Sequence, residues 1–184
     1  MTAEEQRQYW VFAYGSLIWD PGFDAAESVE ARLDGFSRSF CMESVVYRGT
    51  VERPGLVLAL DADPLAHCRG LALRVAAVHW PETLAALRER ELTTGAYREE
   101  LVPLDLADGR RVQAVTYIMR REHVQYVGGL TVEEQARIIA AATGGRGPNR
   151  DYLFNTARHL AQIGLRDPAL DELSRRVQAL IAAN

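Results

Sequence analysis

This sequence is poor in the features that mark several large classes of protein. It has only two cysteines in 184 residues, Cys41 and Cys68, and both lie in apolar, strand-like surroundings. We therefore expect two reduced core residues and not a disulfide-stabilised secreted fold. No apolar stretch reaches the roughly 18 residues that a membrane span needs, and the chain opens without a basic-then-apolar leader. These absences predict a cytoplasmic protein with no membrane partner.

Basic residues are not in excess either. The chain has 21 Lys and Arg against 25 Asp and Glu, which gives a net charge of -4 and argues against nucleic-acid binding. The four histidines have no metal-ligand spacing with one another or with the cysteines, so we expect no metal site. The glycine-rich residues 144–147 lack the Lys-Ser/Thr pair of a phosphate loop, which argues against such a loop.

What is present fits an ordinary globular protein. Hydrophobic residues make up 48% of the chain and charged residues 25%, and the length most simply predicts one domain over residues 1–184. The first two-thirds is dominated by strand patterns. Residues 31–47 predict two strands or one long bent strand, and further strands are expected at residues 9–14, 56–60, 68–75, 99–106 and 111–119. The last two of these predict a hairpin that turns at Asp108-Gly109.

Helical patterns are concentrated in the last third of the chain, apart from one expected helix at residues 80–91. Thr131 and Glu134 have capping-box spacing, which predicts a helix that Gly144-Gly145 ends. We expect Asn149 to cap a helix through Leu160, and Asp167 before Pro168 to cap the final helix. The pattern predicts an α+β protein, a strand-rich body with helices at one side or end.

The stretch from Val11 to Trp19 is the most informative part of the sequence. An apolar and aromatic run stops at Gly15-Ser16 and then turns apolar again. A strand that ends in this way can present successive backbone N–H groups at a concave turn, and such nests bind anions. The alternative is a strand followed by an ordinary turn, since glycine and serine are common in turns. Ser16 does not lie in a Gly-x-Ser-x-Gly elbow, which argues against a serine hydrolase.

Three carboxylates, those of Glu82, Glu89 and Glu91, lie on the expected helix at residues 80–91 or at its end. Acidic residues on a helix are usually solvated. Glu91 differs because it comes at the helix end, beside an apolar loop that runs to Gly95 and Tyr97. Partial burial there would raise its pKa and make it a better general base near neutral pH. Among the basic residues of the strand-rich half, we expect Arg38, Arg48 and Arg53 to face solvent.

Taken together, these segments resemble the ChaC-type γ-glutamylcyclotransferases, enzymes that act on glutathione. The similarity spans roughly residues 10–173 and rests on five segments in the same order. They are residues 12–19 (FAYGSLIW), 37–41 with 47–50, 54–60, 90–97 and 144–153.

The resemblance implies a small mixed β-barrel flanked by helices, with the substrate in a cavity at its mouth. It implies that Glu91 is the catalytic base, that Tyr97 lies near the substrate and that no metal or other cofactor takes part. It also implies that a backbone cradle holds the γ-glutamyl group, formed by Val11, Phe12, Ala13, Tyr14, Gly15, Ser16 and Leu17.

Two residues depart from the family pattern. Ala13 stands where a glycine is common, and Tyr47 stands where a histidine usually precedes Arg-Gly. Both departures bear on substrate recognition more than on reaction type. The alternatives to glutathione degradation are a cyclotransferase for another γ-glutamyl amine or amino acid, and a non-catalytic protein that binds a γ-glutamyl metabolite.

Overall fold

The computed structural model describes residues 8–183 and divides them into two compact units. The first consists of the chain up to Arg38 together with Leu60–His123, and the second consists of Ser39–Ala59 together with the chain from Val124 onward. The long strands β2 (Glu27–Ser44) and β3 (Gly55–Val75) contribute residues to both units. The expectation of one domain over residues 1–184 stays a prediction.

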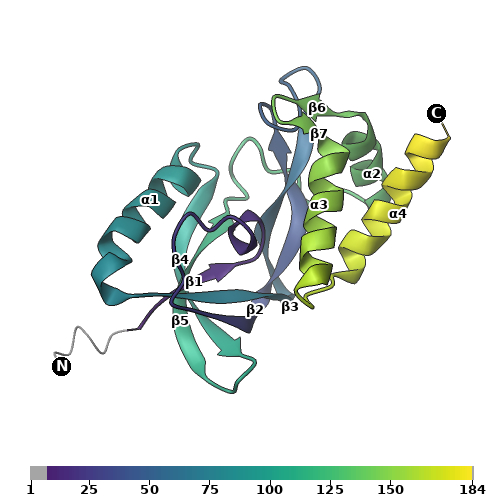
Figure 1. Cartoon of the computed structure of the whole chain (residues 1–184). Helices are drawn as coiled ribbons and strands as arrows, with labels where there is room; N and C mark the ends of the chain where they lie inside the picture. Colours follow the sequence, from purple (N-terminus) through teal and green to yellow (C-terminus); the bar gives the residue numbers. More distant parts are fainter. Residues whose placement is uncertain (1–7, 184) are drawn as a thin grey trace. The chain divides into compact units, whose positions relative to one another are not determined.

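The first unit is built on a closed barrel with strand order β1-β3-β2-β4-β5 (Figure 1). Strands β1 (Tyr9–Ala13), β4 (Tyr97–Leu106) and β5 (Arg111–Met119) complete it. β1 is antiparallel to β3 and parallel to β5, so the barrel is mixed. Buried side chains from all five strands form one cluster, which includes Trp10, Phe12, Leu33, Leu60, Leu104 and Ile118. The expected α+β class and mixed barrel are confirmed.

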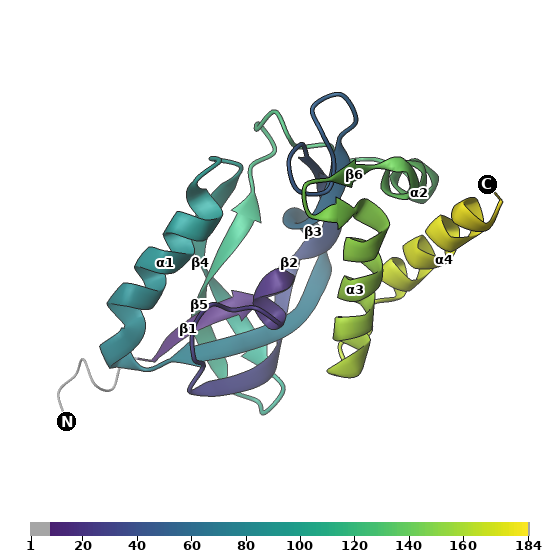
Figure 2. The same ribbon diagram turned by 45° about the horizontal axis from the view of Figure 1, so that its top comes forward.

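Helix α1 (Trp80–Leu92) follows a short 3-10 turn, η2 (Ala77–His79), and runs alongside β4 (Figure 2). Its buried residue Leu87 packs with Val11 and Ala13 of β1. The neighbouring β1 residues Trp10 and Phe12 belong to the other cluster, as expected from the two-residue period of a strand. The helix predicted at residues 80–91 is confirmed, and β1 has a core on each side.

The predicted hairpin is also confirmed. β4 and β5 pair in antiparallel fashion from Tyr97↔Met119 to Asp105↔Arg111. Gly109 in the turn has φ of 88°, a conformation that side chains with a Cβ atom rarely adopt.

The long strands confirm one of the two alternatives expected for residues 31–47, a single bent strand, and correct a second expectation. β2 is one continuous strand, and Gly35 within it has φ of 84°, which lets the strand bend. The separate strands expected at residues 56–60 and 68–75 are one strand, so the break predicted at Asp61 is wrong. The buried Asp61 carboxylate accepts a hydrogen bond from Arg121 Nε at 2.8 Å, and this distant partner satisfies a polar group that would otherwise interrupt the strand.

The second unit contains three helices that contact one another, namely α2 (Val132–Ala141), α3 (Asn149–Gln162) and α4 (Pro168–Ala182). It also contains the two-residue strands β6 (Thr143–Gly144) and β7 (Gly147–Pro148). The capping box at Thr131 and the Asp167 cap are both present as predicted. α2 ends earlier than predicted, because the chain after Ala142 pairs as β6 and β7.

Among residues 8–183 no helix has the length and apolar character needed to cross a membrane.

Asn149 does not cap α3, contrary to the sequence prediction. Helix α3 begins at Asn149 itself, and Pro148 occupies the cap position. The fully buried Asn149 amide instead accepts a hydrogen bond from the Leu56 backbone N–H and donates one to the Leu56 carbonyl, both at 2.7 Å. The side chain therefore acts as a backbone partner for the β3 residues of this unit.

Replacing Asn149 tests that contact. Asn149→Ala leaves the buried N–H and C=O of Leu56 without these partners, so we expect a loss of about 2–4 kcal/mol in the free energy of unfolding. Urea denaturation of the whole chain measures the loss. Asn155→Ala on the exposed side of the same helix is the control and should change stability by about 0.5 kcal/mol or less. Equal stabilities for the two variants would contradict this account of Asn149.

Candidate active site

The end of β1 and the loop behind it form one half of the candidate site. β1 ends at Ala13, and after Tyr14 and Gly15 the chain enters a 3-10 turn, η1 (Ser16–Ile18). Val11, Phe12 and Ala13 are fully buried in the barrel wall, where their strand is bonded to β3 on one side and β5 on the other. Their backbone therefore builds the wall of the site and is largely committed to the sheet.

The open backbone donors lie just beyond the strand, at Gly15, Ser16 and Leu17. Ile18 N–H donates to the Gly15 carbonyl at 2.9 Å, and Asp20 N–H donates to the Ser16 carbonyl at the same distance. Within residues 8–183, no hydrogen bond is donated by the three N–H groups that precede Ile18. Gly15 is buried, yet a Cβ atom added to it meets nothing within 4 Å. The space next to the Gly15 Cα is thus open and adjoins backbone donors, an arrangement suited to an anion.

Tyr14 fixes the start of this loop to the barrel. Its hydroxyl donates a hydrogen bond to the Tyr117 carbonyl at 3.0 Å, and its own carbonyl accepts one from Arg38 Nε at 2.6 Å. Arg38 also donates to the Arg69 carbonyl at 2.5 Å. The prediction that Arg38 faces solvent is wrong, because the half-buried guanidinium bonds two backbone carbonyls in this unit.

In the second unit Arg48 also departs from the expectation of a solvent-facing side chain. It is half-buried and donates to the carbonyls of Arg146 at 2.7 Å and Pro148 at 3.3 Å. Arg53 is exposed, as predicted. A sequence pattern cannot distinguish these cases, because the carbonyl acceptors of Arg38 and Arg48 lie far away along the chain.

Glu91 lies next to the last residue of α1 and forms the second half of the site. Its side chain is 16% exposed, and its Oε1 atom lies 3.2 Å from Arg90 Nε. Burial raises the pKa of the Glu91 carboxyl above its ordinary value, and the nearby Arg90 charge opposes that rise in part. Glu82 and Glu89 on the same helix are exposed. The expected contrast between Glu91 and its acidic neighbours on α1 is therefore present.

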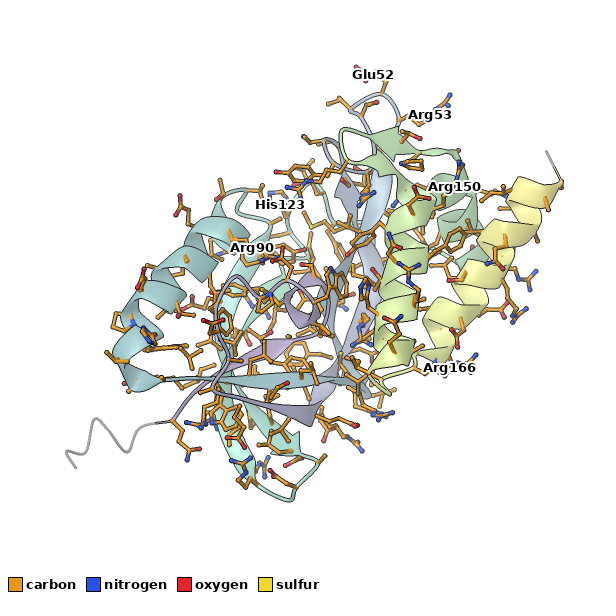
Figure 3. The ribbon with its side chains drawn as sticks, viewed as in Figure 1. Glu52, Arg53, Arg90, His123, Arg150 and Arg166 are labelled. Atoms are coloured by element: carbon orange, nitrogen blue, oxygen red, sulfur yellow. The ribbon has the colours of Figure 1, made fainter. Side chains whose placement is uncertain are left out.

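Arg90 joins the two halves of the site. Its two terminal nitrogens donate to the Asp20 carbonyl at 2.7 Å and to Ser16 Oγ at 3.0 Å. Figure 3 shows Arg90 at the end of α1, beside the loop that follows β1. The structure thus brings the residue next to Glu91 into direct contact with the donor loop. No sequence pattern predicts a role for Arg90, since nothing local shows that its partners are Ser16 and Asp20.

Two tyrosines lie in the same packed region. Tyr97, the first residue of β4, and Tyr117 of β5 belong to one apolar cluster with Leu17 and Leu92. This places Tyr97 in the apolar layer that also contains the end of η1 and the end of α1.

Tyr117 was missed by the sequence analysis. Its hydroxyl donates to Glu99 Oε2 at 3.4 Å, and Arg88 holds the Glu99 carboxylate at 2.8 and 2.6 Å. Burial, together with the negative charges of Glu99 and Glu91, raises the pKa of Tyr117 and keeps it a neutral phenol. The register of the predicted hairpin could have revealed the pair, because Glu99 lies directly opposite Tyr117.

A cavity along α1 lies apart from the candidate site. A space of about 350 Å³ lies between residues 21–24 and one face of α1, and it is lined by residues that include His79, Glu82, Thr83 and Arg90. Neither Glu91 nor the donors at Gly15, Ser16 and Leu17 line it. We place the candidate site at Glu91 and the donor loop because the buried carboxylate and the open donors are found there.

Comparison with known proteins agrees with the resemblance seen in the sequence. Residues 9–180 match the ChaC-like protein family. The glutathione-specific γ-glutamylcyclotransferase of Escherichia coli is 37% identical over 95% of this chain and 75% of its own length. The γ-glutamylcyclotransferase 2-3 of Arabidopsis thaliana is 31% identical over 94% of this chain and 90% of its own.

Comparison with solved structures leads to the same family of enzymes. A crystal structure of the glutathione-specific γ-glutamylcyclotransferase from yeast superposes with a TM-score of 0.81 and 25% sequence identity, and the match covers 95% of this chain and all of the yeast chain. The family match over most of the chain, the two sequence relatives and the shared fold lead to one conclusion. This chain belongs to the ChaC-like protein family.

Proposed function

We propose that this chain is a γ-glutamylcyclotransferase that degrades glutathione to 5-oxoproline and cysteinylglycine. The observation that carries the proposal is the buried Glu91 carboxylate, which Arg90 ties to a loop with open backbone donors. The names of the relatives from Escherichia coli and Schizosaccharomyces pombe, both glutathione-specific γ-glutamylcyclotransferases, support glutathione as the substrate.

The proposed reaction is an intramolecular aminolysis. The α-amine of the γ-glutamyl group attacks its own γ-carbonyl, a five-membered ring closes, and the bond from the γ-carbon to the cysteine nitrogen breaks. The amine enters as an ammonium and must lose a proton before it attacks, while the departing nitrogen must gain one. A single residue that accepts the first proton and returns it to the leaving nitrogen balances the reaction.

Glu91 is the residue we assign to this proton transfer. A carboxylate with an ordinary pKa is a weak base near neutral pH, and burial of Glu91 raises its pKa toward the range where proton transfer is efficient. The neighbouring Tyr117 stays protonated, and Glu99 is neutralised by Arg88. Glu91 is therefore the carboxylate of this group that can accept a proton.

The backbone donors at Gly15, Ser16 and Leu17 are assigned to the anionic part of the substrate. Aligned N–H groups can hold the α-carboxylate of the glutamyl group or steady the oxyanion that forms at the γ-carbon. We assign Val11, Phe12, Ala13 and Tyr14 to the rigid wall that positions those donors, and Tyr97 to the apolar side of the site. A flexible chain held in its ring-closing shape already gains much of the rate enhancement.

The chemistry requires no electron transfer, and the nucleophile and the electrophile belong to one molecule. We therefore propose that the chain's own residues suffice without a cofactor.

We also propose that the protein works in the cytoplasm, because a reducing compartment maintains both glutathione and the buried thiols of Cys41 and Cys68.

Glu91→Gln removes the proposed base while it keeps the size of the side chain. We expect kcat for 5-oxoproline release from glutathione to fall by about 100-fold or more. In the wild type, kcat/KM should rise with pH as Glu91 ionises, and the variant should lose this limb of the profile. Glu89→Gln, one residue away and exposed, is the control and should retain nearly full activity. Near-normal turnover by Glu91→Gln would show that the base is misassigned.

The same substitution should stabilise the fold at neutral pH. The pKa of Glu91 is higher in the folded chain than in the unfolded chain, so the folded chain binds more protons and stability falls as the pH rises through that interval. Glutamine carries no such penalty. We expect Tm of Glu91→Gln to exceed that of the wild type at pH 7–8 and to match it below about pH 4. A thermal-shift series over pH tests this, and a Tm difference that does not change with pH would contradict it.

Gly15→Val tests the donor loop. The position of the added Cβ is open, so the fold should be retained, while the branched side chain enters the space next to the donors. We expect KM for glutathione to rise about tenfold or more, with a Tm within a few degrees of the wild type. Steady-state kinetics and thermal denaturation separate the two effects. An unchanged KM in a folded Gly15→Val protein would mean that the substrate lies elsewhere.

A further inference from the structure

We propose that Arg90 is a positioning residue for the reaction, a single guanidinium that fixes the Glu91 carboxylate and the donor loop relative to each other. The inference rests on the proposed function and adds a role for a side chain to which the mechanism above gives no step of the reaction. It follows from the way this one side chain divides its contacts.

Each nitrogen of the Arg90 guanidinium has a different partner. Nε lies 3.2 Å from Glu91 Oε1, one terminal nitrogen donates to the Asp20 carbonyl at 2.7 Å, and the other donates to Ser16 Oγ at 3.0 Å. The planar group thus spans the base and both ends of the turn that carries the open donors. A guanidinium can make these contacts together because its N–H groups form a rigid fork, whereas an ammonium acts as a point charge.

An exposed ion pair between chain neighbours would carry little weight, because such pairs stabilise a protein by about 1 kcal/mol at most. In this pair only the Arg90 end is exposed to that degree, since the Arg90 side chain is 34% exposed and the Glu91 side chain 16%. Arg90 also donates the hydrogen bonds that connect α1 to the loop after β1, through Ser16 Oγ and the Asp20 carbonyl. Loss of the Arg90 side chain would remove its two hydrogen bonds to the loop and leave the Glu91 carboxylate without its cation.

Arg90 is also the cation that acts on the proposed base. Two titratable groups interact electrostatically with Glu91, namely Arg90 on α1 and the neutral Tyr117 on β5. The Tyr117 hydroxyl in turn donates to Glu99 on β4, whose charge Arg88 compensates, and Tyr97 of β4 packs in the same apolar cluster as Tyr117. Burial favours the protonated form of Glu91, and Arg90 favours the ionised form that can accept a proton. The balance between burial and the Arg90 charge sets the fraction of Glu91 that is ionised, and so able to accept a proton, near neutral pH.

Three variants of the full chain separate the charge from the geometry. Arg90→Met removes the charge and all three contacts. Arg90→Lys keeps a positive charge but cannot reproduce the fork. Ser16→Ala removes one loop contact and leaves the Arg90–Glu91 pair. Arg69→Met is the matched control, since it removes an exposed arginine of the same unit whose side chain pairs with Glu30.

Two readouts are needed. The first is the pH profile of kcat/KM and the KM for glutathione. The second is the NMR titration of the ¹³C-labelled Glu91 carboxyl in substrate-free protein, assigned by its loss in Glu91→Gln. The second readout does not depend on activity, so it tests Arg90 even if the wild type releases no 5-oxoproline and the proposed function fails.

We expect the Arg90→Met titration to move to higher pH, with about a tenfold loss of kcat/KM at pH 6 that shrinks as the pH rises. Arg90→Lys should keep the titration near that of the wild type and raise KM severalfold. Ser16→Ala should raise KM without moving the titration, and Arg69→Met should change neither. A Glu91 titration in Arg90→Met that coincides with the wild type, or a KM unchanged in both Arg90→Lys and Ser16→Ala, would overturn the proposal.

Discussion

The candidate site depends on the hydrogen bonds that Arg90 donates to Ser16 Oγ and to the Asp20 carbonyl. These bonds join residues 70 and 74 positions apart in the chain and bring the end of α1 against the loop that follows β1. The loop has the open donors and the helix end has the buried acid, so neither element is a site without the other. The packing of Leu87 against Val11 and Ala13 holds the helix in place beneath this contact.

The charges around the candidate site leave one carboxylate, that of Glu91, suited to accept a proton. Arg88 neutralises Glu99 and lowers its pKa, and the Tyr117 hydroxyl donates to the same carboxylate and stays protonated. Of the two carboxyl groups, only Glu91 has a raised pKa, which is caused by its burial. A buried acid of this kind reduces stability at neutral pH, which is a common cost of a functional site. The chain contains no lysine. Arginine therefore makes the ion pairs with Glu91 and Glu99, and its forked guanidinium can reach several acceptors.

Features with local causes could be predicted from the sequence. The β4–β5 hairpin follows from Asp108-Gly109 and the flanking strand patterns, α1 from its helical spacing, and the caps at Thr131 and Asp167 from side chains that bond their own helix. The predictions that were wrong concern groups with distant partners. Asp61 does not break β3 because Arg121 pairs with it, Asn149 bonds Leu56 and not its own helix, and Arg38 bonds the Tyr14 carbonyl.

The sequence by itself determined the class of the fold, the strand that precedes Gly15-Ser16 and the candidacy of Glu91. Apolar periodicity, glycine at a turn and an acid beside an apolar loop are local properties. Only the tertiary structure decided that Gly15, Ser16 and Leu17 are the open donors, that Arg90 holds them to α1, and that Tyr117 and Glu99 form a pair beside Glu91. The physical reason is that burial and hydrogen-bond partnership depend on which segments meet in space. The same linear pattern of residues is compatible with many different tertiary contacts between segments.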